Sequence, residues 1–476
     1  MINSKHIRLK SVTITVLLIA LLAMFSCKKN KQEPSGYMPL KFSVEKLDFD
    51  TIMTETGSIT KNFLVYNPTN RDVLINKIFL TNGYNSEFVV NVNGVSGKQF
   101  ENVYLDSKDS IFIFVQTKLK ENNVDTLLFH DDSLAFVCHE TSSHVPLTAW
   151  GQDVIKHRGE TIQNLTIEKG KPHVIIDSMV VEEGGTLTLK AGARLLIHHS
   201  SNLIIDGSLI IEGTVDEPAI ITSDRLEEAY GLVPAQWGSI IFNSSSKNNS
   251  INYANIKNGV NGIIIYGKEN QLVDISITNS TIGIFSANGI YAQNADITCH
   301  NTIISDVSNY ALSLQGGKHS FTHTTIANYG AVGNRNGAPA ISISDHLLRN
   351  KVPANLIEAN FRNSVIIGSY ANEIEFLSET KDKTFPVIFD YCLIKDQISA
   401  AEKQYYTNKI TYEESKNLFV DKKNINFKLD TLSQAKDKGS LIYGNLIPLD
   451  ILKHNRVEDS KPDVGADEYF YEEIVP

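Results

Sequence analysis

One stretch of the chain, residues 224–236, combines charged and aromatic residues ahead of a tryptophan. It carries Asp224, Arg225 and Tyr230 and leads directly into Trp237. Asp224 and Arg225 are candidates for catalysis, because a carboxylate can transfer a proton while a guanidinium stabilises developing negative charge. Tyr230 and Trp237 are candidate ligand-binding residues, whose rings could stack on sugars. The alternatives are a solvated charged loop and a tryptophan that packs at the edge of the fold.

A second stretch, residues 329–355, carries Arg335, Asp345, His346 and Arg349. We predict that Arg335 binds a ligand and that His346 and Arg349 are further catalytic candidates, since histidine supplies a base and arginine a fixed positive charge. The alternative is that these charges face water. Loops that project from a rigid scaffold often carry function, so we expect both stretches to border a groove.

The other histidines are poor metal ligands by their spacing. His198 and His199 are adjacent in a strand-like run, so they face opposite sides. His319 and His323 are four residues apart, but in a strand this spacing separates two side chains widely. We therefore expect no metal site formed by histidines.

The charge balance bears on the partners of the chain. Lysine and arginine total 44 against 54 aspartates and glutamates, a net charge of -10. Nucleic-acid binding requires clustered lysine and arginine, so no nucleic acid is expected as a partner. The 42% hydrophobic content is typical of a folded protein.

The N-terminus has the order of a secretory signal. Three basic residues precede an apolar run, residues 12–25, which is short for a membrane-spanning helix. Ser26-Cys27 follows and resembles a lipobox, although Met24 and Phe25 depart from its usual residues. The resemblance implies cleavage before Cys27 and diacylation of that cysteine. An ordinary signal peptide with a chance cysteine is the alternative.

A lipidated Cys27 implies a membrane as one partner of the chain. Lysines rather than aspartate follow the cysteine, so retention in the inner membrane is not indicated. The implied location is the outer membrane, and both its periplasmic and its outer face are compatible with the sequence. Residues 27–36 are polar and would form a short tether.

Three further cysteines, Cys138, Cys299 and Cys392, lie in strand-like apolar runs, and none forms a CxxC pair. We predict that they are buried small apolar side chains. The alternative is a Cys299–Cys392 disulfide, which an oxidising compartment would permit if strand stacking brought the two together.

Residues 37–153 contain about seven short β-type runs separated by turn signals, which predicts a β-sandwich. The segments VYNPTNRDVLINKI, DSIFIFV and VPLTAWGQ resemble immunoglobulin-like anchor domains of bacterial envelope proteins. The resemblance implies a spacer or docking role for this domain.

From residue 154 the sequence becomes repetitive. Gly-Thr-Leu-Thr-Leu at 185–189 recurs as Gly-Ser-Leu-Ile-Ile at 207–211. A period of roughly 20 to 28 residues built from short β-type runs predicts a parallel β-helix over residues 154–428. A second repeat ends in asparagine or aspartate, which tolerate a left-handed backbone and can bond to the next coil, so we interpret it as a structural ladder. Its members are Asn258, Asn279, Asp306, Asn328 and Asn363.

Several of these coil segments, such as VVEEGGTLTLKAGARLLI, LIIDGSLIIEGT and AQWGSI, resemble pectin-lyase-like right-handed β-helix proteins. The resemblance implies the fold, but this fold hosts many functions. Lyases of the fold pair a base with calcium-bound carboxylates, and hydrolases need two acids at a fixed separation. The hydrolase motifs Asn-Thr-Asp, Gly-His-Gly and Arg-Ile-Lys are missing, and the pair Asp131-Asp132 falls in the first domain.

Residues 429–476 are expected to cap the open end of the β-helix, because an uncapped end exposes unpaired backbone. Within them KPDVGADEY looks like the closing segment of similar bacterial β-helices. Asp437, Gly439, Asp463 and Gly465 are predicted capping-turn residues. Calcium bound by the acids is the alternative, and no other cofactor is expected.

The sequence therefore predicts an all-β protein in five parts: signal peptide 1–26, tether 27–36, immunoglobulin-like β-sandwich 37–153, right-handed parallel β-helix 154–428 and cap 429–476. The function expected is non-catalytic binding of a glycan or another surface partner by a lipid-anchored envelope protein. The alternative is a polysaccharide lyase or other carbohydrate-active enzyme on the same scaffold.

Overall fold

A computed structural model describes residues 40–380, 383–397, 399 and 402–470. The predicted signal peptide and tether, with Cys27, lie outside the described residues. The chain is an all-β protein, with 52% strand and 4% helix. It divides into two compact units, the first made of residues up to 49, 57–118 and 130–149, and the second of residues 50–56, 119–129 and everything after 149. Among the described residues, no helix is long and apolar enough to cross a membrane.

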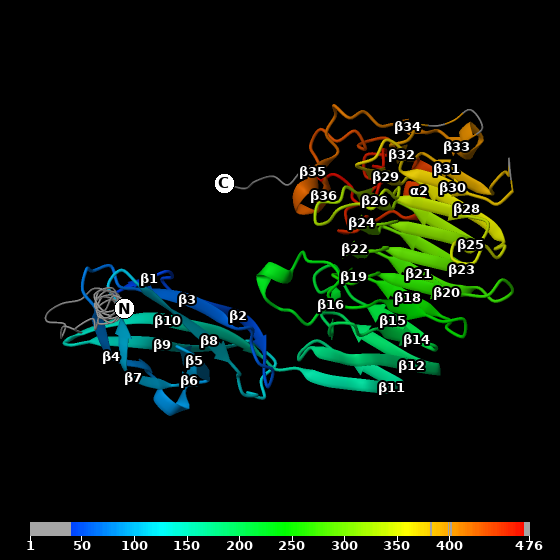
Figure 1. Ribbon diagram of the computed structural model, residues 1–476. Coiled ribbons are helices and arrows are strands. Elements are labelled where there is room, and N and C mark those ends of the chain that lie inside the picture. The colour runs from blue at the N-terminus through cyan, green and yellow to red at the C-terminus, as the bar shows by residue number, and fades with distance from the viewer. Residues whose placement is uncertain (1–39, 381–382, 398, 400–401, 471–476) are drawn as a thin grey trace, which may run out of the picture. The chain divides into compact units, whose positions relative to one another are not determined.

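The first unit is built on two five-stranded sheets, ordered β1-β3-β8-β5-β6 and β2-β10-β9-β4-β7 (Figure 1). Alternate side chains are buried along most of these strands, as Phe63 and Val65 are on β3 while Leu64 between them is partly exposed. This alternation is the pattern of a sheet with one face toward a core. The strands are β1 (Lys41–Phe42), β2 (Leu47–Met53), β3 (Lys61–Tyr66), β4 (Val73–Leu80), β5 (Phe88–Val92), β6 (Val95–Gly97), β7 (Gln99–Leu105), β8 (Ser110–Thr117), β9 (Leu128–Cys138) and β10 (Thr141–Gln152), with the 3-10 helix η1 (Gly83–Asn85).

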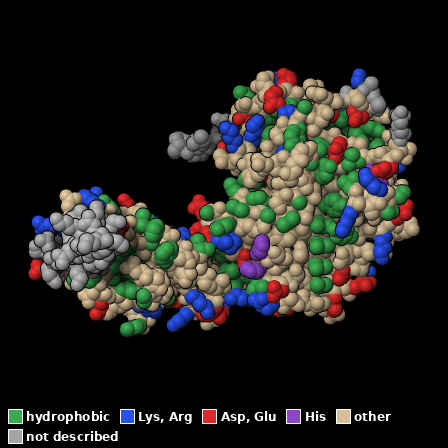
Figure 2. Space-filling view, in the orientation of Figure 1, with side chains coloured by type: hydrophobic (Ala, Val, Ile, Leu, Met, Phe, Trp, Pro, Cys, Tyr) green, Lys and Arg blue, Asp and Glu red, His purple; other side chains and the backbone are tan. Residues whose placement is uncertain are grey.

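The second unit is a 24-stranded parallel sheet through which the chain winds in coils. Beyond the long strands β11 and β12, strands of successive coils fall into three stacks. The first stack holds β13, β16, β19, β22, β24, β26, β29, β32 and β34. The second holds β14, β17, β20, the first halves of β23 and β25, β27 and β30. The third holds β15, β18, β21, the second halves of β23 and β25, β28, β31 and β33. Hydrophobic side chains are also visible on the outer surface of this unit (Figure 2).

The strands of the second unit have these bounds: β11 (Ile155–Ile167), β12 (His173–Lys190), β13 (Arg194–Ile197), β14 (Leu203–Ile205), β15 (Ser208–Glu212), β16 (Ala219–Ser223), β17 (Ile240–Phe242), β18 (Asn249–Asn252), β19 (Ala254–Lys257), β20 (Ile263–Tyr266), β21 (Val273–Thr278), β22 (Thr281–Phe285), β23 (Ile290–His300), β24 (Ile303–Val307), β25 (Leu312–Thr322), β26 (Thr325–Asn328), β27 (Ile341–Ser344), β28 (Leu356–Arg362), β29 (Val365–Gly368), β30 (Ile374–Leu377), β31 (Val387–Asp390), β32 (Leu393–Ile394), β33 (Tyr406–Thr407), β34 (Ile410–Thr411), β35 (Phe419–Asp421) and β36 (Asn426–Leu429). The short helices are η2 (Glu228–Tyr230), η3 (Glu402–Tyr405), η4 (Lys422–Asn424) and α2 (Leu441–Leu446).

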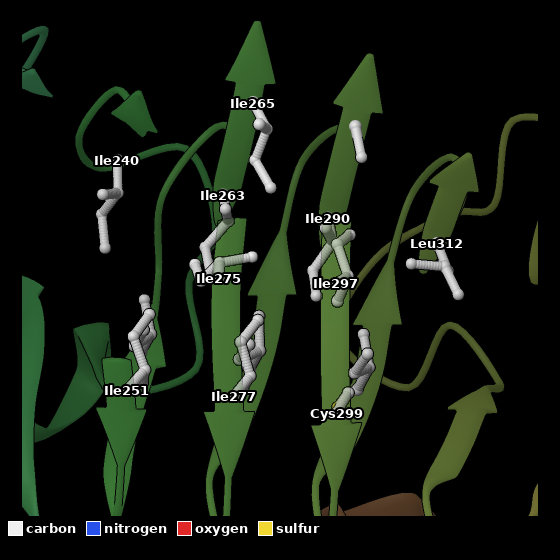
Figure 3. Close-up of a cluster of buried hydrophobic side chains, with 14 of the residues drawn as sticks. Ile240, Ile251, Ile263, Ile265, Ile275, Ile277, Ile290, Ile297, Cys299 and Leu312 are labelled. Atoms are coloured by element: carbon white, nitrogen blue, oxygen red, sulfur yellow. The ribbon is translucent and has the colours of Figure 1, made fainter. Parts of the chain in front are cut away.

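Inward side chains of equivalent strands form continuous columns inside the coils (Figure 3). Ile251 pairs with Ile277 and Ile277 with Cys299, so one column runs through three coils of the third stack. All three side chains are at most 1% exposed. Burial of this kind contributes about 25 cal/mol per Å² of apolar surface. The columns therefore supply the core of the second unit.

The predicted 22-residue repeat is confirmed as two stacked coils, because Leu187 pairs with Leu209. Steric crowding explains why each repeat begins with glycine. A Cβ at Gly207 would come within 2.3 Å of the carbonyl oxygen of Gly185. Only glycine allows the two turns to approach so closely.

The asparagine ladder differs from the prediction in its membership. Asn279 and Asn363 lie at the corner between the third and first stacks, where Asn301 and His323 occupy the same position. All four have left-handed backbones, with φ between 43° and 50°. Asn301 donates to Asn279 Oδ1 at 3.0 Å, which links one coil to the next. The other predicted members, Asn258, Asp306 and Asn328, lie at the far end of the first-stack strands and form a different corner.

The second polar stretch, predicted as one insertion over residues 329–355, is two loops. Strand β27 runs through it and takes its place in the second stack. Residues 329–340 therefore connect the first stack to the second, whereas residues 345–355 connect the second stack to the third. The sequence Ile341-Ser-Ile-Ser344 has the alternation of a strand, which is the local signal for β27.

The C-terminal segment folds back on the outer face of the first stack. Phe427 and Leu429 of the antiparallel β35–β36 hairpin pack with Val365 and Ile367 of β29 in a second hydrophobic cluster. The last parallel strand is β34, and the predicted boundary between residues 428 and 429 falls inside β36. The segment thus covers one side of the upper coils.

The three cysteines are buried as predicted, with exposures of 4%, 1% and 0% for Cys138, Cys299 and Cys392. All three are free thiols. The alternative Cys299–Cys392 disulfide is therefore not formed. Burial raises the pKa of Cys299 and of Cys392 to about 12, so both thiols are protonated and unreactive at neutral pH.

Candidate functional site

A groove runs across the outer face of the first stack. Its floor is made of outward side chains of β19, β22 and β24, including Asn255, Lys257, Thr281 and Ser305. Asn255 pairs with Thr281, while Gly283 lies between Lys257 and Ser305 in the neighbouring column. Consecutive coils thus place amide, ammonium and hydroxyl groups side by side. These are groups that can donate hydrogen bonds to the oxygens of a ligand.

Two segments from opposite ends of the second unit form the apolar walls of the groove. Leu232, 49% exposed, comes from the 224–236 loop, and Ile425 and Phe427 come from the β35–β36 hairpin. The groove has a volume of about 270 Å³. The prediction that the 224–236 loop borders a groove agrees with this position, although Leu232 and not an aromatic residue forms the wall.

Lys257 supplies the positive charge of the groove. Its Nζ donates to the carbonyl oxygen of Gly231 at 3.3 Å, and it forms no salt bridge within the described part of the chain. By contrast, Lys395 and Lys409, whose side chains are 18% and 19% exposed, pair with Glu414 and Asp396. Burial lowers the pKa of Lys257. A partly buried ammonium without a counter-charge is costly, and an anionic ligand would remove that cost.

Two isoleucines of the groove have strained backbones. Ile284 has φ of 64° and Ile425 has φ of 59°, and among the described residues no other β-branched side chain has a positive φ. Such a conformation costs about 1 to 3 kcal/mol for a non-glycine residue. Strain of this kind concentrates at binding and catalytic sites, where surrounding structure holds it in place.

The predicted residues of the first loop lie together, but their charges are satisfied within the second unit. Asp224 lies 2.5 Å from Nδ1 of His198. Arg225 donates to both carboxylate oxygens of Glu227, at 3.1 and 2.8 Å, and its guanidinium lies 3.7 Å from the centre of the Tyr230 ring. The hydrogen bond to Glu227 raises the pKa of Arg225. These contacts give the loop a fixed shape.

Trp237 is 1% exposed, so its ring cannot stack on a sugar, contrary to the prediction of a ligand contact. It packs edge-on against Phe285 with ring centres 6.3 Å apart. Its Nε1 donates to the carbonyl oxygen of Lys257 at 2.8 Å. Trp237 therefore holds the strand that carries the groove lysine, which is the packing role left as the alternative.

Arg335 is also buried, at 3% exposure of its side chain. It forms a bidentate salt bridge with Glu373, with N–O distances of 2.7 and 2.8 Å. It also donates hydrogen bonds to the carbonyl oxygens of Asn328 and Ala338. The guanidinium also lies 4.1 Å from the centre of the Tyr370 ring. With both terminal nitrogens occupied in this way and the side chain buried, Arg335 fastens the 329–340 loop and is not placed to bind a ligand.

Asp345 and His346 contact each other, with Oδ1 and Nδ1 3.0 Å apart. Burial acts to raise the pKa of Asp345, but hydrogen bonds from Ser378, His346 and Lys383 outweigh it and lower the pKa to about 2. Arg349 is exposed. Asp345 is thus a charged anchor for the 345–355 loop.

The four catalytic candidates do not form one site. Asp224 and Arg225 follow β16, whereas His346 and Arg349 follow β27 at another corner of the coil. Four coil steps separate β16 from β26, the first-stack strand that precedes β27. At about 4.8 Å per step the two pairs are about 19 Å apart along the stack. A concerted reaction cannot use groups at that separation.

The groove residues Asn255, Lys257, Thr281 and Ser305 were missed by sequence reasoning. The signal was present in the alternation Ala254-Asn-Ile-Lys257, in which polar residues take the outward positions of a strand. The repeat by itself indicates inward columns and corner residues. The fold was needed to show which outward column remains uncovered.

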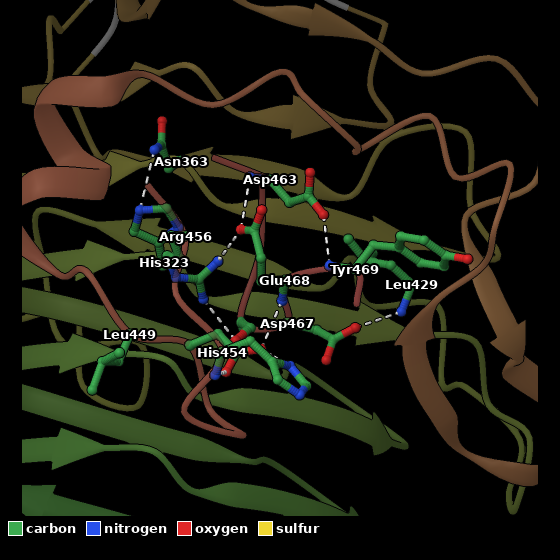
Figure 4. Close-up of polar contacts among 12 residues, drawn as sticks. His323, Asn363, Leu429, Leu449, His454, Arg456, Asp463, Asp467, Glu468 and Tyr469 are labelled. Atoms are coloured by element: carbon green, nitrogen blue, oxygen red, sulfur yellow. Dashed lines mark hydrogen bonds and ion pairs between the residues drawn. The ribbon is translucent and has the colours of Figure 1, made fainter. Parts of the chain in front are cut away.

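The C-terminal segment is held by a buried polar cluster around Arg456 (Figure 4). Arg456 is 0% exposed and donates to Asn301 Oδ1 at 3.0 Å and to Glu468 Oε2 at 3.3 Å. Burial raises the pKa of Asp463 and Asp467 to about 6 and that of Glu468 to about 8. The cluster therefore contains acids that are partly protonated near neutral pH.

The predicted capping residues lie in turns of this segment. Asp463 accepts hydrogen bonds from the amides of Asp437 and Tyr469, both at 2.7 Å. Asp437 and Gly465 have positive φ, at 56° and 109°. Within the part of the chain that the structure describes, no group of three histidine, cysteine or acidic side chains could hold a metal ion.

No protein-family model and no curated protein matches the chain. Similar solved structures include a protein of unknown function from Porphyromonas gingivalis W83, with 13% identity and a TM-score of 0.18 over 26% of this chain and 59% of that one. The E. coli chaperone DraB has 13% identity and a TM-score of 0.17 over 24% and 54%. A PapD-like domain of human CEP192 has 10% identity and a TM-score of 0.17 over 27% and 95%. The chain thus spans between half and two thirds of the first two structures, and likenesses this low carry no argument about function.

Proposed function

We propose that the chain is a lipid-anchored protein of the bacterial envelope that binds an acidic glycan in the groove of the first stack. In this proposal the coiled parallel sheet is a right-handed β-helix of the pectin-lyase-like class, since parallel crossover connections are right-handed in nearly all proteins. The observation that carries the binding function is Lys257, a partly buried ammonium between two apolar walls that has no carboxylate partner in the described residues.

The other groove residues fit an acidic sugar. Lys257 would pair with a uronate carboxylate or a sulfate group, and Asn255, Thr281 and Ser305 would bond ring hydroxyls. The apolar walls suit the hydrophobic face of a sugar ring. The strained backbone in the floor and in the wall is a second, independent sign of a binding site.

Binding is favoured over the alternative, a polysaccharide lyase or other carbohydrate-active enzyme. Elimination at a uronate needs a base and a separate positive charge or metal that stabilises the carboxylate. The described lining of the groove offers one lysine for both tasks. Glycoside hydrolysis needs two carboxyl groups, and the lining contains no acid.

The lipid anchor is tested by Cys27→Ala. Loss of the acylated cysteine should move the protein from the membrane fraction to the soluble fraction. Continued membrane attachment of the variant would remove Cys27 from the proposal. The same experiment distinguishes an acylated N-terminus from an ordinary cleaved signal peptide. With an ordinary signal peptide, the unsubstituted protein and the Cys27→Ala variant would both be soluble.

The glycan function is tested by titration calorimetry of purified protein against acidic and neutral polysaccharides. Lys257→Met keeps the apolar stem and removes the charge, so it should weaken binding of acidic polymers about tenfold, the equivalent of 1.4 kcal/mol. Lys268→Met changes an exposed lysine outside the groove and serves as the matched control. Equal affinity of both variants would exclude the groove. Shortening of a polymer during the titration would favour the lyase alternative.

A further inference from the structure

One sheet of the first unit differs sharply from the other in charge. The strands of the β1-β3-β8-β5-β6 sheet contain no aspartate or glutamate, and their charged residues are Lys41 and Lys61. The strands of the opposite sheet carry five acids and one lysine. In a chain with a net charge of -10, a whole sheet without acids is a distinctive surface.

The outer face of the acid-free sheet is also apolar and aromatic. Phe112 is 52% exposed, Phe114 39% and Val89 41%. The two phenylalanine rings stack with their centres 5.9 Å apart. Leu64 lies opposite Phe112 on the neighbouring strand, which extends the apolar area across β3. Patches of this kind mark surfaces that bind a partner or a membrane.

We propose that this outer face lies against the lipid bilayer and holds the first unit on the membrane surface. The inference rests on the proposed lipid anchor at Cys27. The first described strand, β1, is the edge strand of this same sheet. Twelve residues lie between Cys27 and Leu40, so the two positions are at most about 45 Å apart even in a fully extended chain. An anchored chain therefore keeps the edge strand of this sheet within that distance of the bilayer, and the contact itself is argued from the composition of the face.

Charge and side-chain type also fit a membrane surface. Anionic headgroups repel carboxylates, and this face presents none from its strands, whereas Lys28, Lys29 and Lys31 of the intervening segment would be attracted. Aromatic rings are favoured at the level of the headgroups. A diacylated Cys27 already anchors the chain stably. The contact of this face would in addition fix which side of the first unit lies against the membrane.

The test uses the full lipidated protein in vesicles of phosphatidylethanolamine and phosphatidylglycerol whose acyl chains carry bromine, a contact quencher of tryptophan fluorescence. Phe112→Trp reports on the proposed face. Tyr104→Trp is the matched control, because Tyr104 is 47% exposed on the outer face of the opposite sheet. The unsubstituted protein gives the signal of Trp150 and Trp237 for subtraction.

The added fluorescence of Phe112→Trp should be strongly quenched in brominated vesicles, while that of Tyr104→Trp is not. Equal quenching, or none at either position, overturns the proposal while the protein still floats with the vesicles. Failure to float, together with unchanged fractionation of Cys27→Ala, overturns the lipid anchor itself. The proposal would also be overturned if the protein formed a dimer in solution and the double variant Phe112→Ser with Phe114→Ser were monomeric. The face would then bind a second copy of the chain.

Discussion

The indole nitrogen of Trp237 donates a hydrogen bond of 2.8 Å to the backbone carbonyl of Lys257. The buried ring of Trp237 thus fixes the backbone of Lys257, whose side chain carries the ammonium group of the groove. Asn258 adds to this support, because its amide donates to the carbonyl oxygen of Val233 at 2.8 Å and so holds the loop that forms one wall. Floor and wall are positioned by the same corner of the coil.

Trp237→Phe should weaken both folding and ligand binding. The smaller ring keeps most of the packing against Phe285 but leaves the carbonyl of Lys257 without its donor, at a cost of about 1 to 3 kcal/mol. Urea denaturation measures the loss of stability, and calorimetry with the glycan measures the loss of affinity. Unchanged values in both would mean that the hydrogen bond contributes nothing to the groove.

The ion pair of Arg335 and Glu373 gives a second prediction. Both side chains are at most 3% exposed, so Arg335→Met leaves the buried carboxylate of Glu373 without a counter-charge, with only the amides of Ala340 and Tyr370 donating to it. The variant should cost about 3 to 5 kcal/mol of unfolding free energy. The double variant Arg335→Met with Glu373→Met removes both charges and should be less destabilised than the single one. A double variant no more stable than Arg335→Met contradicts this account.

The corner residues show how far the sequence predicts this fold. Asn279 and Asn363 were identified correctly, since asparagine is a residue type that tolerates positive φ. Asn301 and His323 occupy the same corner but escaped the prediction, because His323 has no asparagine-like signature and the loops change the spacing between coils. Local patterns therefore specify strands and turns well, while the stacking partner of each strand depends on loop lengths that only the fold fixes.

The candidate site was less predictable for a related physical reason. Charged and aromatic loop residues attract notice in a sequence, yet Arg335 and Trp237 are buried by tertiary contacts that no local pattern reports. Lys257 is one of many lysines on strands. It stands out because no carboxylate of the described residues pairs with it. The partners of a side chain, rather than its type, separate groove residues from structural ones.

The register of the coils is tested by a charge placed inside one column. Ile277→Asp puts an unpaired carboxylate between Ile251 and Cys299 and should unfold the second unit at ordinary temperature, since such burial costs several kcal/mol. Ser276→Asp, one residue earlier and on the outward side of the same strand, is the control and should be tolerated. Circular dichroism melting distinguishes the two. Similar melting curves for both variants would falsify the inward assignment of Ile277.

The cap should weaken as the pH rises. Burial raises the pKa of Glu468 from 4.5 to about 8, with the neighbouring Asp463 adding to the effect and Arg456 opposing it. In the unfolded chain Glu468 ionises near its ordinary pKa, so between the two values the unfolded state holds fewer protons and is favoured. Stability therefore falls from about pH 4.5 to pH 8, by at most about 1.4 kcal/mol per pH unit for this group.

Glu468→Gln removes that titration while it keeps an oxygen to accept from Arg456 and from the amide of Asp463. The variant should show a flatter dependence of unfolding free energy on pH, measured by urea denaturation at a series of pH values. Glu458→Gln, which changes an exposed acid elsewhere in the same segment, is the matched control and should retain the slope of the unsubstituted protein. If Glu468→Gln retains that slope as well, Glu468 is ionised in the folded cap, and its bond with Arg456 is a full ion pair that would strengthen the cap as the pH rises.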